Sequence, residues 1–200
     1  MPSKIVCVGR NYLEHAKELG NDVPAEPLIF LKPPSSLIGD GEAIVLPTHM
    51  SQQVEFEGEI GIVIGKRLSH ATEEEAVAGI DGIVALNDVT ARDLQRKDSQ
   101  WARAKGFDTF CAVGPVAPAP ADLSQLEVVT RHNGVERQRA TASQMAFSIP
   151  FLLSYISTIM TLVPGDLVAT GTPAGVARLA SGDQVEVEIV GLSRVHNTVR

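Results

Sequence analysis

Cysteine is scarce in this 200-residue sequence, which contains only Cys7 and Cys111. Both residues lie in apolar stretches, so we expect two buried thiols in a reducing compartment and no disulfide. The cysteines and histidines do not have the spacing of a zinc site. The sequence therefore favours neither a disulfide-stabilised nor a zinc-stabilised fold.

Positive charge and long hydrophobic runs are also lacking. The 17 Lys and Arg residues are outnumbered by 24 Asp and Glu residues, and the formal net charge of −7 argues against a nucleic-acid partner. The longest apolar segment, residues 149–163, is too short and too rich in Ser, Thr and Tyr to span a bilayer. The first residues lead into a strand-like run without an apolar signal region. We expect a cytoplasmic protein with no membrane partner.

The sequence is rich in short apolar, β-branched runs that are bounded by turn residues. Hydrophobic residues make up 44% of the chain and charged residues 20%, which is typical of a globular protein with one core. Many short strands and few helices predict a β-rich α+β fold, and no repeat or internal boundary divides residues 1–200. Strands are expected at 5–8, 28–31, 43–46, 54–64, 80–86, 126–131, 135–139, 167–170, 184–190 and 193–199, and helices at 12–19, from 73 and at 150–160.

One of these strands carries a row of acidic residues. Glu55, Glu57 and Glu59 alternate along it, so their side chains should project from one face. Like charges in a row repel and are costly to bury, which indicates a cation among them. A hard divalent cation, Mg²⁺ or Mn²⁺ before Ca²⁺, suits oxygen ligands. The alternative is an exposed strand face that is merely acidic.

Other polar residues have two interpretations each. His15 and Glu18 are three positions apart on the expected helix at 12–19, where a carboxylate beside an imidazole makes a general base. The same helix face could simply be solvated. Asp88 follows a buried strand, as a turn residue or as a further metal ligand. Lys105 lies between small residues that allow close backbone approach.

Several motifs together resemble the fumarylacetoacetate hydrolase family. They are CVGRNY at 7–12 with His15 and Glu18, FLKP at 30–33, EGE at 57–59 before VIG at 63–65, NDVTARD at 87–93, WARAKGF at 101–107, and PGD at 164–166 with TGTP at 170–173. Each motif is weak alone, but they occur in the family's order across nearly the whole chain. The resemblance implies a mixed β-sandwich roll of the family's C-terminal-domain type with a few short helices. It also implies one catalytic domain over residues 1–200 and a homodimer, as in the compact acylpyruvases and oxaloacetate decarboxylases.

The resemblance also assigns roles to residues. Three carboxylates match the family's ligands for Mg²⁺ or Mn²⁺, with Ca²⁺ as a substitute: Glu57, Glu59 and Asp88. A histidine and a glutamate, His15 and Glu18, match the family's water-activating dyad. Four residues match contacts to the substrate carboxylate and keto oxygens: Arg10, Gln95, Lys105 and Thr172, of which Lys105 is also catalytic. Lys32 is a weaker candidate.

Two positions are not explained by the family's pattern. Glu55 is not a family ligand, so we expect its surroundings to neutralise it. Ala177 replaces a glycine that is commoner in relatives, which would affect the loop beside Thr172 but not the metal ligands.

The resemblance implies an enzyme that acts on small keto acids. The first expectation is a metal-dependent hydrolase that cleaves acylpyruvates, such as acetylpyruvate or fumarylpyruvate, to pyruvate and a carboxylic acid. The alternatives are an oxaloacetate decarboxylase, a keto–enol tautomerase, or an isomerase of aromatic-catabolic intermediates. All would use a metal-stabilised enolate. A non-catalytic protein that binds metal and keto acid is the alternative of another class.

Overall fold

The computed structural model describes residues 1–14 and 24–200. Within these ranges the strands form a seven-stranded sheet in the order β2-β1-β12-β6-β7-β9-β3, a five-stranded sheet in the order β11-β10-β13-β14-β4, and the pair β5-β8. The strands are β1 (Ile5–Gly9), β2 (Leu28–Lys32), β3 (Leu37–Ile38), β4 (Ala43–Ile44), β5 (Val54–Glu55), β6 (Gly58–Ile64), β7 (Ile80–Asp88), β8 (Thr90–Ala91), β9 (Cys111–Val113), β10 (Glu127–His132), β11 (Val135–Thr141), β12 (Leu167–Ala169), β13 (Gln184–Ile189) and β14 (Ser193–Val199).

The core lies on both faces of the seven-stranded sheet. Because side chains alternate along a strand, Val6 and Val8 of β1 join the larger hydrophobic cluster, which the five-stranded sheet also lines, whereas Ile5 and Cys7 join a smaller cluster. Cys111 belongs to that smaller cluster as well, and burial raises the pKa of its thiol to about 12. Both cysteines are free and buried, as predicted.

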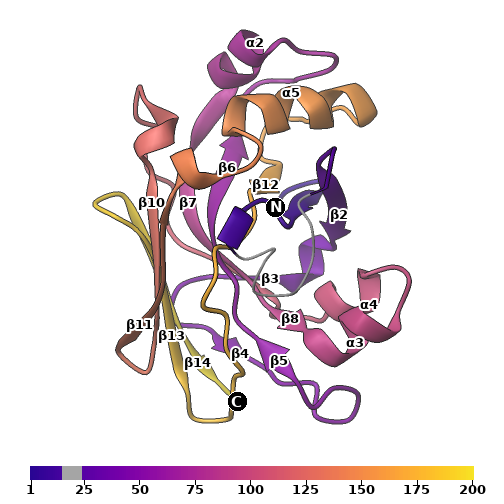
Figure 1. Ribbon diagram of the computed structural model, residues 1–200, viewed down its shortest axis with the longest axis vertical. Coiled ribbons are helices and arrows are strands. Elements are labelled where there is room, and N and C mark those ends of the chain that lie inside the picture. Colours follow the sequence, from indigo (N-terminus) through magenta and orange to yellow (C-terminus); the bar gives the residue numbers. More distant parts are fainter. Residues whose placement is uncertain (15–23) are drawn as a thin grey trace.

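Two helices lie together at one end of the sheets (Figure 1). Helix α2 (Glu73–Ala78) begins with a capping box on Thr72, and α5 (Ile149–Ile159) begins at Ser148, whose hydroxyl accepts the N–H of Phe151. Both starts agree with the sequence patterns. Short 3₁₀ turns occur at η1 (Pro34–Ser36), η2 (Leu123–Gln125) and η3 (Ala142–Gln144).

Two further helices bring polar residues close to the short strand pair β5-β8. Helices α3 (Arg92–Lys97) and α4 (Ala102–Lys105) follow strand β8 and lie beside it (Figure 1). Strand β8 pairs with β5, which leads directly into the acidic strand β6. Residues that are far apart in the sequence therefore meet at this end of the molecule.

The architecture confirms the predicted fold class, a sheet-rich α+β fold with few short helices. The Asn-Gly turn is present, with Asn133 at φ 51° and Gly134 at φ 76° between β10 and β11. Most of the helix predicted at 12–19 lies outside the described residues, and Tyr12 forms an isolated bridge with Met145. In the described ranges, no helix combines the length and apolarity that a membrane crossing requires.

Candidate metal and substrate site

Three carboxylates converge where strands β6 and β7 meet. The two strands are antiparallel and pair Gly58 with Asn87, so Glu57 and Glu59 come beside Asp88 at the end of β7. The Asp88 N–H donates to the Glu57 carbonyl at 2.8 Å, which locks this register. One oxygen of each carboxylate lies within 4.8 Å of the others, and all three side chains are buried.

Buried cations surround this acidic triad, Glu57, Glu59 and Asp88. The Lys105 ammonium lies 2.7 Å from Glu57 Oε2 and 2.7 Å from Asp88 Oδ2. Lys32 lies 2.7 Å from Asp88 Oδ1 and also donates to a backbone carbonyl. Lys32 is therefore a counter-ion of the triad, and it does not line the pocket described below.

Arg92 neutralises the acidic residue that is not expected to be a ligand. Its Nε lies 2.8 Å from Glu55 Oε2, and its Nη2 lies 2.6 Å from Glu57 Oε1. Its Nη1 donates to Gln95 Oε1 at 2.6 Å. The guanidinium therefore links the acidic strand to helix α3, which agrees with the expectation that the surroundings of Glu55 balance its charge.

The charges around the triad leave one carboxylate without a counter-ion. Among the described residues, Glu59 has no ion pair, although it accepts the Gly171 N–H at 2.7 Å. Burial raises the pKa of Glu59 well above its usual value, and the charges of Asp88 and Glu57 raise it further against the influence of Lys105. A divalent cation would remove this excess negative charge, and three carboxylate oxygens are the donors that Mg²⁺ and Mn²⁺ prefer. The residues present therefore fit such an ion.

Lys105 stays positively charged in this environment. Burial alone would lower the pKa of Lys105, but Asp88 and Glu57 outweigh that effect and raise it above the usual value of a lysine. At neutral pH the side chain is an ammonium group. Lys105 therefore places a positive charge beside the triad.

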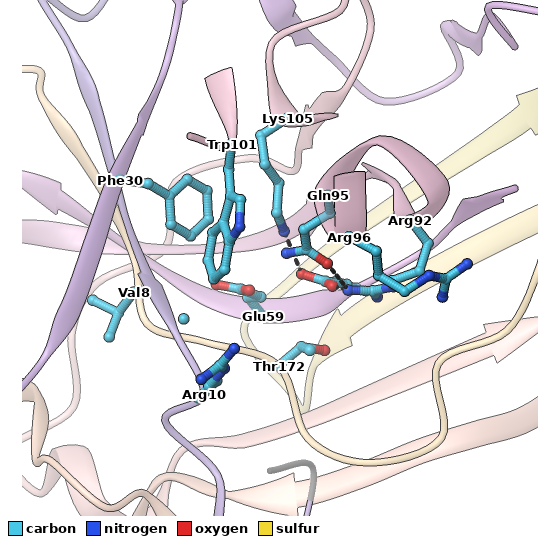
Figure 2. Close-up of a pocket in the computed structure, with 12 residues that line it drawn as sticks. Val8, Arg10, Phe30, Glu59, Arg92, Gln95, Arg96, Trp101, Lys105 and Thr172 are labelled. Atoms are coloured by element: carbon cyan, nitrogen blue, oxygen red, sulfur yellow. Dashed lines mark hydrogen bonds and ion pairs between the residues drawn. The ribbon is translucent and has the colours of Figure 1, made fainter. Parts of the chain in front are cut away.

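A cavity of about 410 Å³ opens over the triad. Figure 2 shows Glu59 between Arg10 and Thr172 on one side and Lys105 with Trp101 on the other. The residues that line it are Val8, Gly9, Arg10, Phe30, Glu57, Glu59, Arg92, Gln95, Arg96, Trp101, Lys105 and Thr172.

Arg10 reaches this cavity from an uncommon backbone conformation. It follows strand β1 with φ 59°, in the left-handed region that residues other than glycine rarely adopt. Such strain often accompanies functional positions. Arg10 supplies a positive charge to the wall of the cavity, as required of a residue that binds a carboxylate.

Thr172 is held by a network that the sequence did not reveal. Its hydroxyl donates to the Gly58 carbonyl at 2.9 Å and accepts from Gln138 Nε2 at 2.8 Å. Gln138 also donates to the Pro173 carbonyl and accepts the Gly58 N–H at 3.0 Å. Because the hydroxyl proton is committed, a donor contact from Thr172 to a substrate would come from its backbone N–H.

The structure brings together most of the predicted site residues. Those that line the cavity or form the triad are Glu57, Glu59, Asp88, Arg10, Gln95, Lys105 and Thr172. His15 and Glu18 lie outside the described residues.

The sequence patterns do not indicate roles for Arg92, Gln138 and Trp101. Arg92 belongs to the NDVTARD motif, and its proximity in sequence to Asp88 was the available signal. Trp101 stands in the WARAKGF motif without a role of its own. Gln138 had no signal, because it reaches the site from the opposite sheet.

The fold and the site describe a sheet-rich protein with a buried acidic triad that could hold a divalent cation and with a polar cavity above it. The family profile for the fumarylacetoacetate (FAA) hydrolase C-terminal domain matches residues 4–200. The chain belongs to the fumarylacetoacetate hydrolase family, which confirms the resemblance.

Named sequence relatives and similar solved structures agree with membership of this family. The chain is 44% identical to the mitochondrial oxaloacetate tautomerase FAHD1 of Arabidopsis thaliana over 96% of this chain and 89% of the relative. It is 39% identical to oxaloacetate tautomerase YisK of Bacillus subtilis, over 99% of this chain and 70% of that relative. The structure of 2-hydroxyhepta-2,4-diene-1,7-dioate isomerase from Mycobacterium marinum superimposes with a TM-score of 0.90 at 44% identity, over 99% of this chain and 74% of that one.

Proposed function

We propose that this chain is a divalent-metal-dependent enzyme that stabilises the enolate of a 2-oxo acid, and that it interconverts the keto and enol forms of oxaloacetate or a close analogue. The observation that carries the proposal is the buried triad of Glu57, Glu59 and Asp88 beneath a cavity that also holds the Lys105 ammonium. The names of two relatives, both oxaloacetate tautomerases, support the choice of reaction.

The triad would hold Mg²⁺ or Mn²⁺, and Ca²⁺ as a substitute. When bound, the ion supplies Lewis-acid stabilisation of the enolate oxygen. Arg10 on the cavity wall would bind a substrate carboxylate through charge-assisted hydrogen bonds. Gln95 is oriented by Arg92, which occupies its carbonyl oxygen and leaves its amide N–H groups to donate to the substrate.

Lys105 would stabilise the charge that develops when the substrate loses a proton. In tautomerisation a proton leaves the carbon next to the keto group, and a proton is added to the former keto oxygen. The protonated Lys105 lies in the cavity wall and offers a preorganised positive charge near that oxygen. For the group that accepts the proton, His15 supported by Glu18 remains the prediction.

Hydrolysis of acylpyruvates is the second candidate function. The specific observation in its favour is the retained pair of His15 and Glu18 at a spacing of three residues, which suits the activation of water. The sequence motifs favour hydrolysis first, whereas the names of the relatives favour tautomerisation. Decarboxylation of oxaloacetate would use the same enolate. A homodimer, a keto-acid substrate, one catalytic domain over residues 1–200 and a cytoplasmic location remain predictions.

An absorbance assay tests the proposal. We expect the purified protein to accelerate decay of the enol absorbance of oxaloacetate with Mg²⁺ and to lose that effect with a chelator. Acetylpyruvate is measured in parallel, with pyruvate release as the readout for cleavage. Faster cleavage of acetylpyruvate than tautomerisation of oxaloacetate would reverse the order of the two candidates, and metal-independent turnover would contradict both.

His15→Ala separates the reactions. We expect this substitution to suppress hydrolysis by about 10²–10⁴-fold if His15 activates water. Decarboxylation, which needs no attacking water, should suffer less. Equal losses in both reactions would mean that His15 positions the substrate instead.

A further inference from the structure

Two cavities of the molecule share one aromatic wall. The cavity over the triad, of about 410 Å³, and a second cavity, of about 340 Å³, both include Phe30 and Trp101 in their linings. The second cavity is mostly apolar and is otherwise lined by Ile29, Leu31, Gln100, Ala102 and Met160. The two rings therefore stand between a charged reaction site and an apolar space.

The two aromatic rings of this wall support each other. Their centroids are 5.3 Å apart and the planes meet at 71°, the edge-to-face arrangement that aromatic pairs prefer. Phe30 comes from strand β2, whereas Trp101 comes from the turn before helix α4. Figure 2 shows the rings next to each other at the edge of the pocket.

Both residues of this wall, Phe30 and Trp101, also lie close to Lys105. The Trp101 carbonyl accepts the Lys105 N–H at 2.9 Å, and the Lys105 ammonium lies 4.9 Å from the Phe30 ring centroid. A substrate held near Lys105 would therefore lie close to the two rings, and the position of the indole would limit how far it can extend in their direction.

The indole ring of Trp101 packs closely against Gly9. A Cβ atom at position 9 would lie 2.9 Å from Cζ3 and 3.2 Å from Cη2 of Trp101, closer than van der Waals contact allows. Gly9 does not have a positive φ, so its backbone would accept alanine. An added methyl group at this position must push the ring away from strand β1.

We propose that Trp101, packed against Gly9 and Phe30, is the residue that limits the length of the substrate group opposite the carboxylate that Arg10 would bind. Short 2-oxo acids such as oxaloacetate fit the first cavity alone, and longer apolar acyl chains are excluded because the indole closes the way to the second cavity. This inference rests on the proposed action on 2-oxo acids.

The test compares chain-length profiles of two opposed variants. Trp101→Ala removes the wall, and Gly9→Ala displaces it without removing the ring. The kcat/KM of each variant is measured for acylpyruvates from acetyl to hexanoyl, relative to its own value for oxaloacetate. Phe151→Ala, on the surface of helix α5 and outside both cavities, is the matched control.

We expect Trp101→Ala to raise the relative kcat/KM for the longest chain by at least about tenfold, since one methylene in an apolar pocket is worth roughly 10–200-fold. Gly9→Ala should shift the chain-length profile from that of the parent, and Phe151→Ala should not. An unchanged profile in Trp101→Ala, or equal losses on all chain lengths, would overturn the inference. Mn²⁺ affinity is measured in every variant to confirm an intact triad.

A binding series keeps the inference testable if the proposed reaction is wrong. N-alkyl oxamates mimic 2-oxo acids and carry chains of increasing length, and their Kd values are measured by calorimetry with Mg²⁺ present. If neither oxaloacetate nor acylpyruvates are turned over, the proposed function fails. Tighter binding of long oxamates to Trp101→Ala than to the parent would still support the wall, and identical chain-length profiles would overturn it.

Discussion

Replacing Arg92 by methionine should leave buried carboxylates beside the triad without their counter-ion. Arg92 is 3% exposed, and it pairs with Glu55 at 2.8 Å and with Glu57 at 2.6 Å. Methionine preserves an apolar side chain of similar reach but removes the guanidinium. Glu57 would keep its ion pair with Lys105, whereas the side-chain partner left to Glu55 within residues 1–14 and 24–200 would be the amide of Gln53, at 2.8 Å.

The size of the effect follows from these remaining partners. Removing one member of a buried ion pair typically costs about 3–5 kcal/mol, because the other charge is left uncompensated. Since Glu57 and Glu55 both keep a polar partner, we expect the lower end, a loss of about 3 kcal/mol in the free energy of unfolding. For a chain of this size, about 1 kcal/mol shifts Tm by roughly 2–4 °C, so Tm should fall by about 6–12 °C.

The assay is equilibrium unfolding in urea combined with calorimetry. The double variant Glu55→Gln/Arg92→Met should recover part of the loss, by about 1–2 kcal/mol, because the stranded carboxylate is gone. An Arg92→Met protein within about 0.5 kcal/mol of the parent would refute this reasoning. So would a double variant less stable than the single one.

Three other predictions follow from the same structure. The raised pKa of Glu59 means that an ion must displace a proton, so Mn²⁺ affinity should keep rising with pH above the range in which an ordinary glutamate titrates, as calorimetry can measure. Burial would raise the pKa of Asp166, but hydrogen bonds from the Lys4 ammonium, the Ser3 hydroxyl and the Val163 N–H outweigh that effect and lower it. Asp166→Asn should cost about 2–3 kcal/mol in urea unfolding at neutral pH. This difference should shrink as acid protonates Asp166 in the parent, because a lowered folded-state pKa stabilises only above it. Gln138→Leu should weaken Mn²⁺ binding by roughly tenfold in the same titration, since Gly58 and Thr172 lose their partner, and unchanged affinity would exclude a positioning role.

Sequence patterns predicted those structural elements that depend on residues close together in the chain. The turn at Asn133 and Gly134, the cap at Ser148 and the alternation along the acidic strand each depend on residues within a few positions of one another. The two-residue strands β3, β5 and β8 were not predicted separately. Each exists because a distant segment supplies its hydrogen-bond partners, as when Val54 pairs with Ala91.

Some residues of the candidate site could also be predicted from local sequence, whereas others could not. The carboxylates could be named because their spacing and the family motifs mark them. The side chains that balance or position them could not be matched to partners, since Lys32 reaches Asp88 across 56 residues and Gln138 reaches Gly58 across 80. The first pairing arises from the order of strands within the seven-stranded sheet and the second from the packing of the two sheets, and neither leaves a periodic trace in the sequence.

Mn²⁺ binding to a matched pair of variants tests the central claim most directly. Glu55 and Glu57 are both buried glutamates of the acidic segment and both contact Arg92, but only Glu57 belongs to the triad. Electron paramagnetic resonance counts free Mn²⁺ during titration of the parent, Glu57→Gln and Glu55→Gln. We expect the parent and Glu55→Gln to bind one ion per chain and Glu57→Gln to lose that binding. Equal binding by all three proteins would contradict a metal site on this triad.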